Sequence, residues 1–424
     1  IHLIVSAVIY KQKLGDRNLF YLVSGLFFVF ITIAIPVQLH GHWIMILWAA
    51  EAALLFWIGR TKSVTFYETL SYPLMFLAFF SVLRGLSIIN TAIDQLLLRD
   101  MPTPFYNITF LTSLIFVSCF GIINIINQNK NYTAPWQGKD AIPKLMSYVI
   151  PGIFLISLYF TFLKEITNYW GLLLKSSEIT INIKGQTLPD IHVNYDLEKL
   201  QVVWIINYSL LFFSILSFIN IKKIKNANLG YVNLAINTFV VLMFLTFGLY
   251  MLSELRDSYL QQTLSQYYYR GVFHIIIRYI SFAFVATIIY AIYKYIEQEF
   301  LDIDLKIAFD IMLFITILWI ASSELINWMD IAHSTQSYKL GLSILWGIYS
   351  LMLIALGIWK KGKHLRIGAI IIFGLTLAKL FLYDISYLDT ISKTIVFVSL
   401  GILLLIISFL YNKYKNIISG DTEE

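Results

Sequence analysis

Residues 199–225 read KLQVVWIINYSLLFFSILSFINIKKIK, and this stretch contains the pattern that decides the fold. Residues 199–220 carry a single charge, Lys199. They are long enough to cross a bilayer, because a membrane-spanning helix needs about 20 apolar residues. The basic turn formed by Lys222, Lys223 and Lys225 follows directly. An apolar span that ends in a basic turn is typical of a multi-pass membrane protein.

The same pattern recurs along the whole chain. Hydrophobic residues make up 58% of the sequence and charged residues 13%, with a mean hydropathy of +0.74. A soluble domain cannot bury that much apolar surface, so the sequence predicts an all-α integral membrane protein with about twelve transmembrane helices. The predicted spans are 18–39, 42–60, 66–89, 104–126, 145–165, 199–220, 229–252, 271–293, 304–325, 338–359, 366–386 and 391–412.

The first residues indicate a truncated start. Residues 1–10 are apolar, begin without a methionine and are half as long as a span, so we expect a partial helix and a fragment of a longer chain. No charged region or cleavage site typical of a signal peptide is present. We interpret residues 1–424 as a single polytopic membrane domain. The single cysteine, Cys119, lies inside a span and is interpreted as a small apolar residue.

Lys and Arg alternate between cation-rich and cation-poor loops, which predicts the orientation. We assign the cation-rich loops, and the tail 413–424, to the cytoplasmic side of the membrane. The net charge of +6 follows from these loops and does not indicate nucleic acid binding. The cation-rich set is Lys11, Lys13, Arg17, Arg60, Lys62, Lys130, Lys139, Lys144, Lys222, Lys223, Lys225, Lys294, Lys306, Lys360, Lys361, Lys363, Arg366, Lys413 and Lys415. The opposite set is Arg99, Lys164, Lys175, Lys184, Lys199, Arg256, Arg270, Lys339 and Lys393.

One long loop, 166–198, lies on the predicted periplasmic side. Within it, residues 179–183 and 191–195 alternate between apolar and polar positions and flank a turn region with Gly185 and Pro189. Alternation on both sides of a turn predicts a small β-hairpin, with an irregular loop as the alternative. In loop 253–270, three consecutive tyrosines (267–269) suit an aromatic belt at the membrane surface or a stacking platform for a sugar.

Two stretches far apart in the chain are similar to one another. Residues 48–60 read WAAEAALLFWIGR, and residues 346–360 read WGIYSLMLIALGIWK. The tryptophan and glycine have the same spacing in both, and each stretch leads through a basic turn into a helix with one cation, Arg84 or Lys379. The pattern indicates a parallel internal repeat, with chance similarity of apolar helices as the alternative.

Two regions also resemble a known family. Residues 39–60 contain Trp48 and Glu51, and residues 346–415 contain Leu365, Lys379 and Asp384 before an apolar final helix. Both regions resemble bacterial membrane proteins grouped as domain of unknown function 2339. The resemblance implies a polytopic architecture and a bacterial source, and it implies no activity, because the biochemical role of that family is not established.

Ionisable residues inside spans are energetically costly and often face a cavity or a partner. At 1.5 Å per residue, Arg84, Arg278 and Lys379 lie at a similar depth in the outer half of the bilayer. One interpretation is an outward-facing cavity that binds an anion through these cations. The alternatives are ion pairs that hold helices together and cations that reach the outer surface. The other candidate binding residues are Glu51, His274, Glu324 and Asp384.

No cofactor or metal is predicted. His40 and His42 flank one glycine in an outer turn, but a third metal ligand is not apparent, so they are interpreted as interfacial histidines. The sequence contains no glycine-rich phosphate loop, no His-Glu-x-x-His motif and no Gly-x-Ser-x-Gly motif.

Three functional hypotheses remain open. The first is an inner-membrane protein that binds or transports an anionic envelope lipid or lipid-linked glycan in the outward-facing cavity. The second is a membrane-embedded transferase on a lipid or glycan, in which Glu51 is the candidate base. The third is a scaffold subunit without catalytic activity. Expected partners are membrane lipids, the anionic lipid or glycan, and another protein in a membrane complex.

Overall fold

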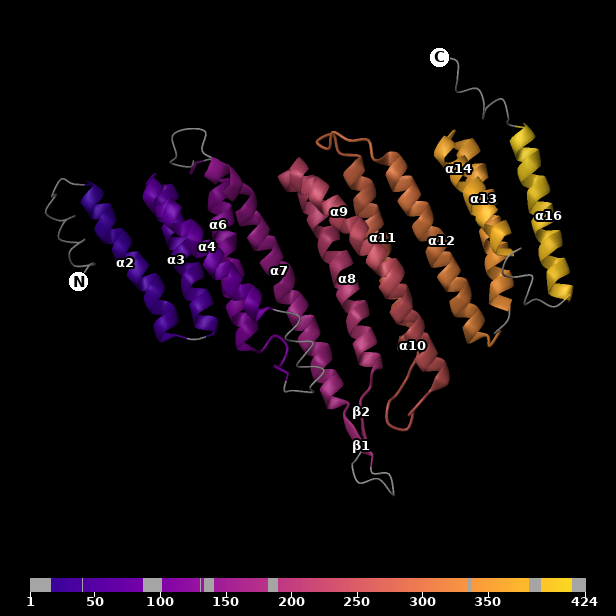
Figure 1. Cartoon of the computed structure of the whole chain (residues 1–424), viewed down its shortest axis with the longest axis horizontal. Helices are drawn as coiled ribbons and strands as arrows, with labels where there is room; N and C mark the ends of the chain where they lie inside the picture. The colour runs from indigo at the N-terminus through magenta and orange to yellow at the C-terminus, as the bar shows by residue number, and fades with distance from the viewer. Residues whose placement is uncertain are drawn as a thin grey trace, which may run out of the picture. The chain divides into compact units, whose positions relative to one another are not determined.

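The computed structural model describes residues 17–39, 41–86, 101–129, 131–132, 141–181, 190–334, 337–380 and 390–413. These residues are 84% helical, and one two-stranded sheet is found among them (Figure 1). The chain divides into two compact units, Ile1–Gln201 and Val202–Glu424. The predicted all-α membrane architecture is therefore confirmed. Of the candidate binding residues named above, only Asp384 lies outside the described residues.

As far as the predicted spans lie within the described residues, each of them coincides with a helix. Nine helices within the described ranges are long and apolar enough to cross a membrane. The first unit contains α2 (Arg17–Gln38), α3 (His42–Thr61), α4 (Thr65–Gly85), α6 (Ile108–Gln128), α7 (Ala141–Ser176), β1 (Ile179–Ile181) and β2 (Asp190–His192). The helix α8 (Asp196–Ile219) leads into the second unit, which contains η1 (Asn220–Ile224), α9 (Ala227–Met243), η2 (Phe244–Gly248), α10 (Leu249–Gln261), α11 (Phe273–Ile296), α12 (Lys306–Ile331), α13 (Ser337–Trp359), α14 (Lys363–Lys379) and α16 (Thr390–Lys413).

The outward surfaces of the helices are apolar. Phe80 is 65% exposed, Ile125 is 69% exposed and Phe239 is 60% exposed. Such side chains are unfavourable against water and suited to hydrocarbon, where the backbone polar groups of a helix are already paired. The exposed apolar surface therefore fits a chain that lies in a bilayer.

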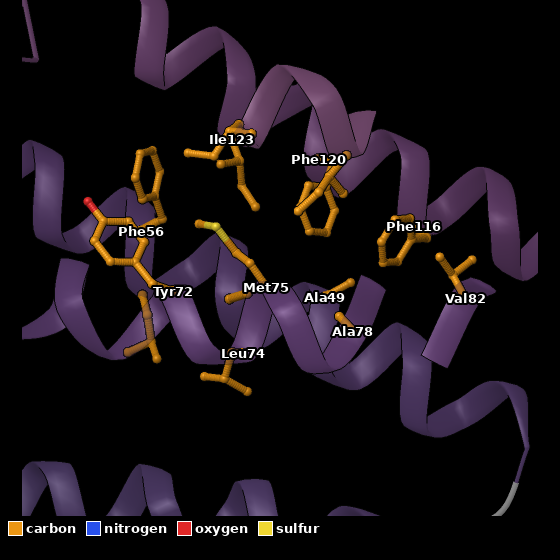
Figure 2. Packing of buried hydrophobic residues seen from close by; sticks show 14 of the residues in the cluster. Ala49, Phe56, Tyr72, Leu74, Met75, Ala78, Val82, Phe116, Phe120 and Ile123 are labelled. Carbon is orange, nitrogen blue, oxygen red and sulfur yellow. The ribbon is translucent and has the colours of Figure 1, made fainter. Parts of the chain in front are cut away.

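The first unit has a well-packed interior (Figure 2). The helix α3 packs against α4 and α6, and α6 packs against α7. Phe116 and Phe120 on α6 stack with ring centroids 4.5 Å apart, and Met75 on α4 is fully buried beside them. The small residues Ala49 and Ala78 are also fully buried, which lets α3 and α4 approach closely.

The turn between α8 and α9 shows how polar residues end a span. The helix α8 continues through the π-turn η1, and Lys225 then takes a left-handed conformation with φ of 53°. The Asn226 side chain accepts a hydrogen bond from the backbone N–H of Leu229 and caps α9. The buried Asn220 side chain donates to the Asn226 carbonyl at 2.9 Å. The predicted basic turn is therefore fixed by asparagine hydrogen bonds.

The predicted β-hairpin is confirmed. The strands β1 and β2 pair in antiparallel fashion, with Ile179 opposite His192 and Ile181 opposite Asp190. The backbone N–H of Asn194 donates to the Ser177 hydroxyl at 3.0 Å, which joins the base of the hairpin to the end of α7. The Gly185–Pro189 turn region lies outside the described residues.

Candidate functional site

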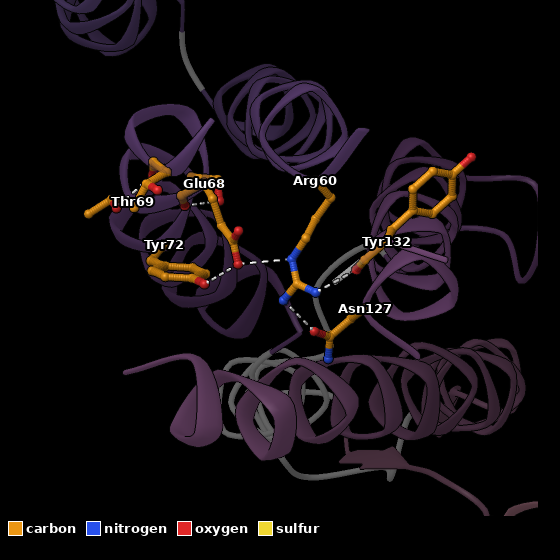
Figure 3. Close-up of polar contacts among 8 residues, drawn as sticks. Arg60, Glu68, Thr69, Tyr72, Asn127 and Tyr132 are labelled. Carbon is orange, nitrogen blue, oxygen red and sulfur yellow. Dashed lines mark hydrogen bonds and ion pairs between the residues drawn. The ribbon is translucent and has the colours of Figure 1, made fainter. Parts of the chain in front are cut away.

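The first unit contains a buried ion pair that sequence analysis missed (Figure 3). The Nε atom of Arg60 lies 2.9 Å from Oε1 of Glu68, and neither side chain is more than 6% exposed. Arg60 also donates through Nη1 to the Tyr132 carbonyl at 3.0 Å and through Nη2 to Oδ1 of Asn127 at 3.1 Å. The Tyr72 hydroxyl donates to Glu68 at 2.7 Å. Every nitrogen of this guanidinium group thus has an acceptor.

The position of this pair follows from one glycine. A Cβ atom at Gly59 would lie 2.7 Å from the backbone nitrogen of Glu68, so only glycine allows α3 and α4 to meet here. Sequence analysis assigned Arg60 to a basic loop, but Arg60 is buried. The signal available in the sequence was a cation and an acid at the facing ends of two helices joined by a short turn. Each guanidinium nitrogen of Arg60 is thus satisfied, as expected of a structural ion pair, whereas Oε2 of Glu68 has no hydrogen-bond partner among the described residues.

The second unit brings together three of the predicted site residues. Arg278 on α11 is 1% exposed and pairs through Nε with Glu324 on α12. Its Nη2 donates to the Ser323 hydroxyl, and the Tyr279 hydroxyl donates to Oε2 of Glu324 at 3.1 Å. His274, one turn before Arg278, is 8% exposed, and its Nδ1 lies 3.1 Å from the Gly271 carbonyl.

A second arginine that sequence analysis assigned to an outer loop joins this site. Arg256 near the end of α10 is 5% exposed. Its Nη2 lies 2.8 Å from Oδ1 of Asp257 and 2.9 Å from Oδ2 of Asp330 on α12. Arg256 and Arg278 therefore both pair with acids on α12. We call Arg256, Arg278, Glu324 and Asp330 the arginine cluster.

The arginine cluster differs from the Arg60 network in its unused hydrogen-bond donors. The Nη1 atoms of Arg256 and Arg278 are both buried, and neither has an acceptor in the described part of the chain. A buried donor left without an acceptor costs about 1–3 kcal/mol, and more when it is charged. The acids are less buried, because the side chain of Glu324 is 21% exposed and that of Asp330 is 28% exposed. Two positively charged N–H edges are therefore available to an anionic oxygen.

The remaining predicted residues take separate positions. Glu51 in the first unit is 9% exposed and accepts from the Thr32 hydroxyl at 3.0 Å, while its Oε2 has no partner among the described residues. Arg84 in the same unit is exposed in the last turn of α4, as expected for a cation that reaches the membrane surface. Lys379 in the second unit donates to the Ser343 hydroxyl at 2.9 Å.

Of the two predicted interfacial histidines, His42 lies within the described residues and His40 does not. Nε2 of His42 lies 3.4 Å from the Thr109 hydroxyl. Within the described ranges, no three His, Cys, Asp or Glu side chains are grouped so that they can hold a metal ion.

Comparison with known proteins establishes the family. Residues 2–414 match the family model described as predicted membrane protein (DUF2339). The chain belongs to this family. The resemblance inferred from the two quoted regions is thus confirmed and extends across nearly the whole of this DUF2339 chain. No curated protein and no solved structure matches the chain.

Proposed function

We propose that this DUF2339 protein binds an anionic group of an envelope lipid or lipid-linked glycan at the arginine cluster. The observation that carries the proposal is that the buried Nη1 atoms of Arg256 and Arg278 have no acceptor among the described residues. A phosphate or carboxylate oxygen accepts such charge-assisted hydrogen bonds well, and arginine favours both groups because of its planar fork.

The charge balance of the cluster determines how an anion binds. Asp257, Glu324 and Asp330 already accompany the two guanidinium groups. An incoming anion therefore contacts the unpartnered Nη1 edges or displaces one of the partly exposed carboxylates. Displacement is feasible because neither Glu324 nor Asp330 is fully buried. We place this end of α12 on the periplasmic side of a bacterial inner membrane, following the predicted orientation.

The test counts bound lipids in purified protein. We expect native mass spectrometry to show fewer retained phosphatidylglycerol molecules for Arg256→Gln and for Arg278→Gln than for the unaltered protein. Phosphatidylcholine, which is zwitterionic, should show no such difference. Arg60→Gln is the matched control, because it breaks a buried pair in the first unit without altering the cluster. Equal phosphatidylglycerol retention in all four proteins would contradict the proposal.

A structural role is the second candidate. It is favoured by the ion pairs that Arg256 and Arg278 already make to α12. If these pairs only hold α10, α11 and α12 together, the protein acts as a membrane scaffold. In that case Arg278→Gln lowers the unfolding temperature and leaves lipid retention unchanged. Binding and stability measured on the same variant therefore separate the two functions.

A further inference from the structure

Two helical hairpins, α3–α4 in the first unit and α13–α14 in the second, share the same internal contacts. The Trp48 indole donates to the Thr32 carbonyl on the preceding helix α2 at 3.2 Å. The Trp346 indole donates to the Ser322 hydroxyl on the preceding helix α12 at 2.9 Å. Equivalent tryptophans thus connect each hairpin to the helix before it.

The next matched position also contacts the preceding helix. Glu51 accepts from Thr32 on α2, and Tyr349 at the matching position donates to the Phe314 carbonyl on α12 at 2.6 Å. The agreement at two positions supports the internal repeat predicted from the sequence.

The glycine contacts of the two hairpins agree as well. A Cβ atom at Gly59 would meet Glu68 on α4, and a Cβ atom at Gly357 would meet Cγ of Arg366 on α14 at 2.7 Å. Glu68 and Arg366 follow their glycines at the same spacing. The two hairpins therefore place Glu68 and Arg366 at equivalent positions, directly against the facing helix.

The charges at these positions differ, and the second hairpin has no counter-ion for Arg366 among the residues that the structure describes. In the first hairpin, Glu68 pairs with Arg60, the residue after the glycine. In the second, the residue after the glycine is Ile358, and Arg366 is 6% exposed with no acceptor for Nη1 in the described ranges. Asp310 on α12 already has a partner, because its Oδ2 lies 3.0 Å from Nε2 of His364, two residues before Arg366.

The surroundings of Arg366 favour a phosphate. Arg366 is the fourth residue of α14 and lies roughly 4.5 Å inside the start of that helix. The helix N-terminus has no side-chain cap and carries partial positive charge. Lys360, Lys361 and Lys363 are exposed at the adjoining turn. Burying a guanidinium group without a counter-ion costs free energy, and the charge around Arg366 is positive. Both effects favour the binding of an anion here.

We propose that Arg366, with the basic turn at residues 360–363, binds the phosphate of an anionic membrane lipid. The site lies at the opposite end of α12 from the arginine cluster, because Asp310 and Asp330 are separated by roughly 30 Å of helix. It is therefore independent of the proposed function. Arg366 holds two phosphate oxygens through its fork, and the exposed lysines contribute charge at the membrane surface.

The repeat itself provides the decisive variant. Ile358→Glu places a carboxylate where the first hairpin has Arg60, and so supplies Arg366 with an internal counter-ion. We expect this variant to retain phosphatidylglycerol on the order of tenfold more weakly in native mass spectrometry, because the carboxylate occupies the guanidinium. It should also unfold at a higher temperature than the unaltered protein in lipid-free detergent. Arg366→Gln should lose the same lipid without this gain in stability.

Controls separate this site from others. Lys62→Gln removes an exposed cation from the turn of the first hairpin, outside this site, and should leave retention unchanged. Arg278→Gln should leave this lipid in place, so failure of the arginine cluster does not affect the result. Inorganic phosphate that raises the unfolding temperature as much as phosphatidylglycerol identifies free phosphate as the ligand and overturns the lipid assignment. Unchanged lipid retention in both Ile358→Glu and Arg366→Gln overturns the site.

Discussion

Replacing Glu68 by Gln removes the counter-ion of a buried arginine and retains the size of the side chain. Glu68 is 0% exposed and accepts hydrogen bonds from both Arg60 and Tyr72. Removing one partner of a buried ion pair costs about 3–5 kcal/mol, because the other charge stays buried without compensation. The Gln amide oxygen can still accept one hydrogen bond, so we expect a loss near the lower end of that range, about 3 kcal/mol.

A double-mutant cycle tests the energetic coupling between Arg60 and Glu68. We expect Arg60→Ile combined with Glu68→Leu to cost far less than Glu68→Gln alone, because replacing both charges removes the uncompensated group. The second hairpin has isoleucine at the position equivalent to Arg60, so the fold accommodates this side chain. The measurement is the free energy of unfolding in mixed detergent and denaturant, with loss of helical circular dichroism as the signal.

Two results would refute this account of the first hairpin. The first is a cost below about 1 kcal/mol for Glu68→Gln, which would place the pair in contact with water. The second is a double variant whose cost equals the sum of the single variants, because residues that form one ion pair are expected to be coupled.

Three further changes test the packing and charges of other helices. Gly59→Ala should lower the stability of the fold by about 1–3 kcal/mol in thermal unfolding, because the new Cβ would lie 2.7 Å from the backbone of α4. Gly85→Ala should be close to neutral in the same thermal unfolding assay, because a Cβ at Gly85 has no atom within 4 Å. Glu51→Gln should be at least as stable as the unaltered protein by the same assay, since it removes a buried charge and keeps an acceptor for its hydroxyl partner; a large loss would show that the charged form is required. Hydrogen bonds from Tyr293 and Lys294 lower the pKa of Glu297 below 4.5, so this carboxylate stabilises the fold at neutral pH and ceases to do so as pH falls through the lowered value. Comparing acid unfolding of the protein with that of Glu297→Gln measures this difference, and identical pH profiles would exclude the contribution.

The arrangement of the spans could be predicted from the sequence because it depends on local properties. The length of an apolar stretch such as 199–220 determines that it forms a membrane-spanning helix, since lipid leaves backbone groups no other partners. Alternation of apolar and polar residues in 179–183 and 191–195 likewise predicted a hairpin, and the strands that form pair residues 179–181 with 190–192. The repeated spacing of Trp48 and Gly59 indicated an equivalent hairpin, and the contacts of Trp346 and Gly357 agree with it.

What only the tertiary structure decided is which charges meet. Arg60 and Arg256 look like loop cations in the sequence, but both are buried against acids from other helices. The rotation of each helix about its axis, and the close approach allowed by Gly59, place these side chains, and neither is a local property of the chain. Arg366 is a further example, because it is buried without a described partner only as a result of the packing of α14 against α13.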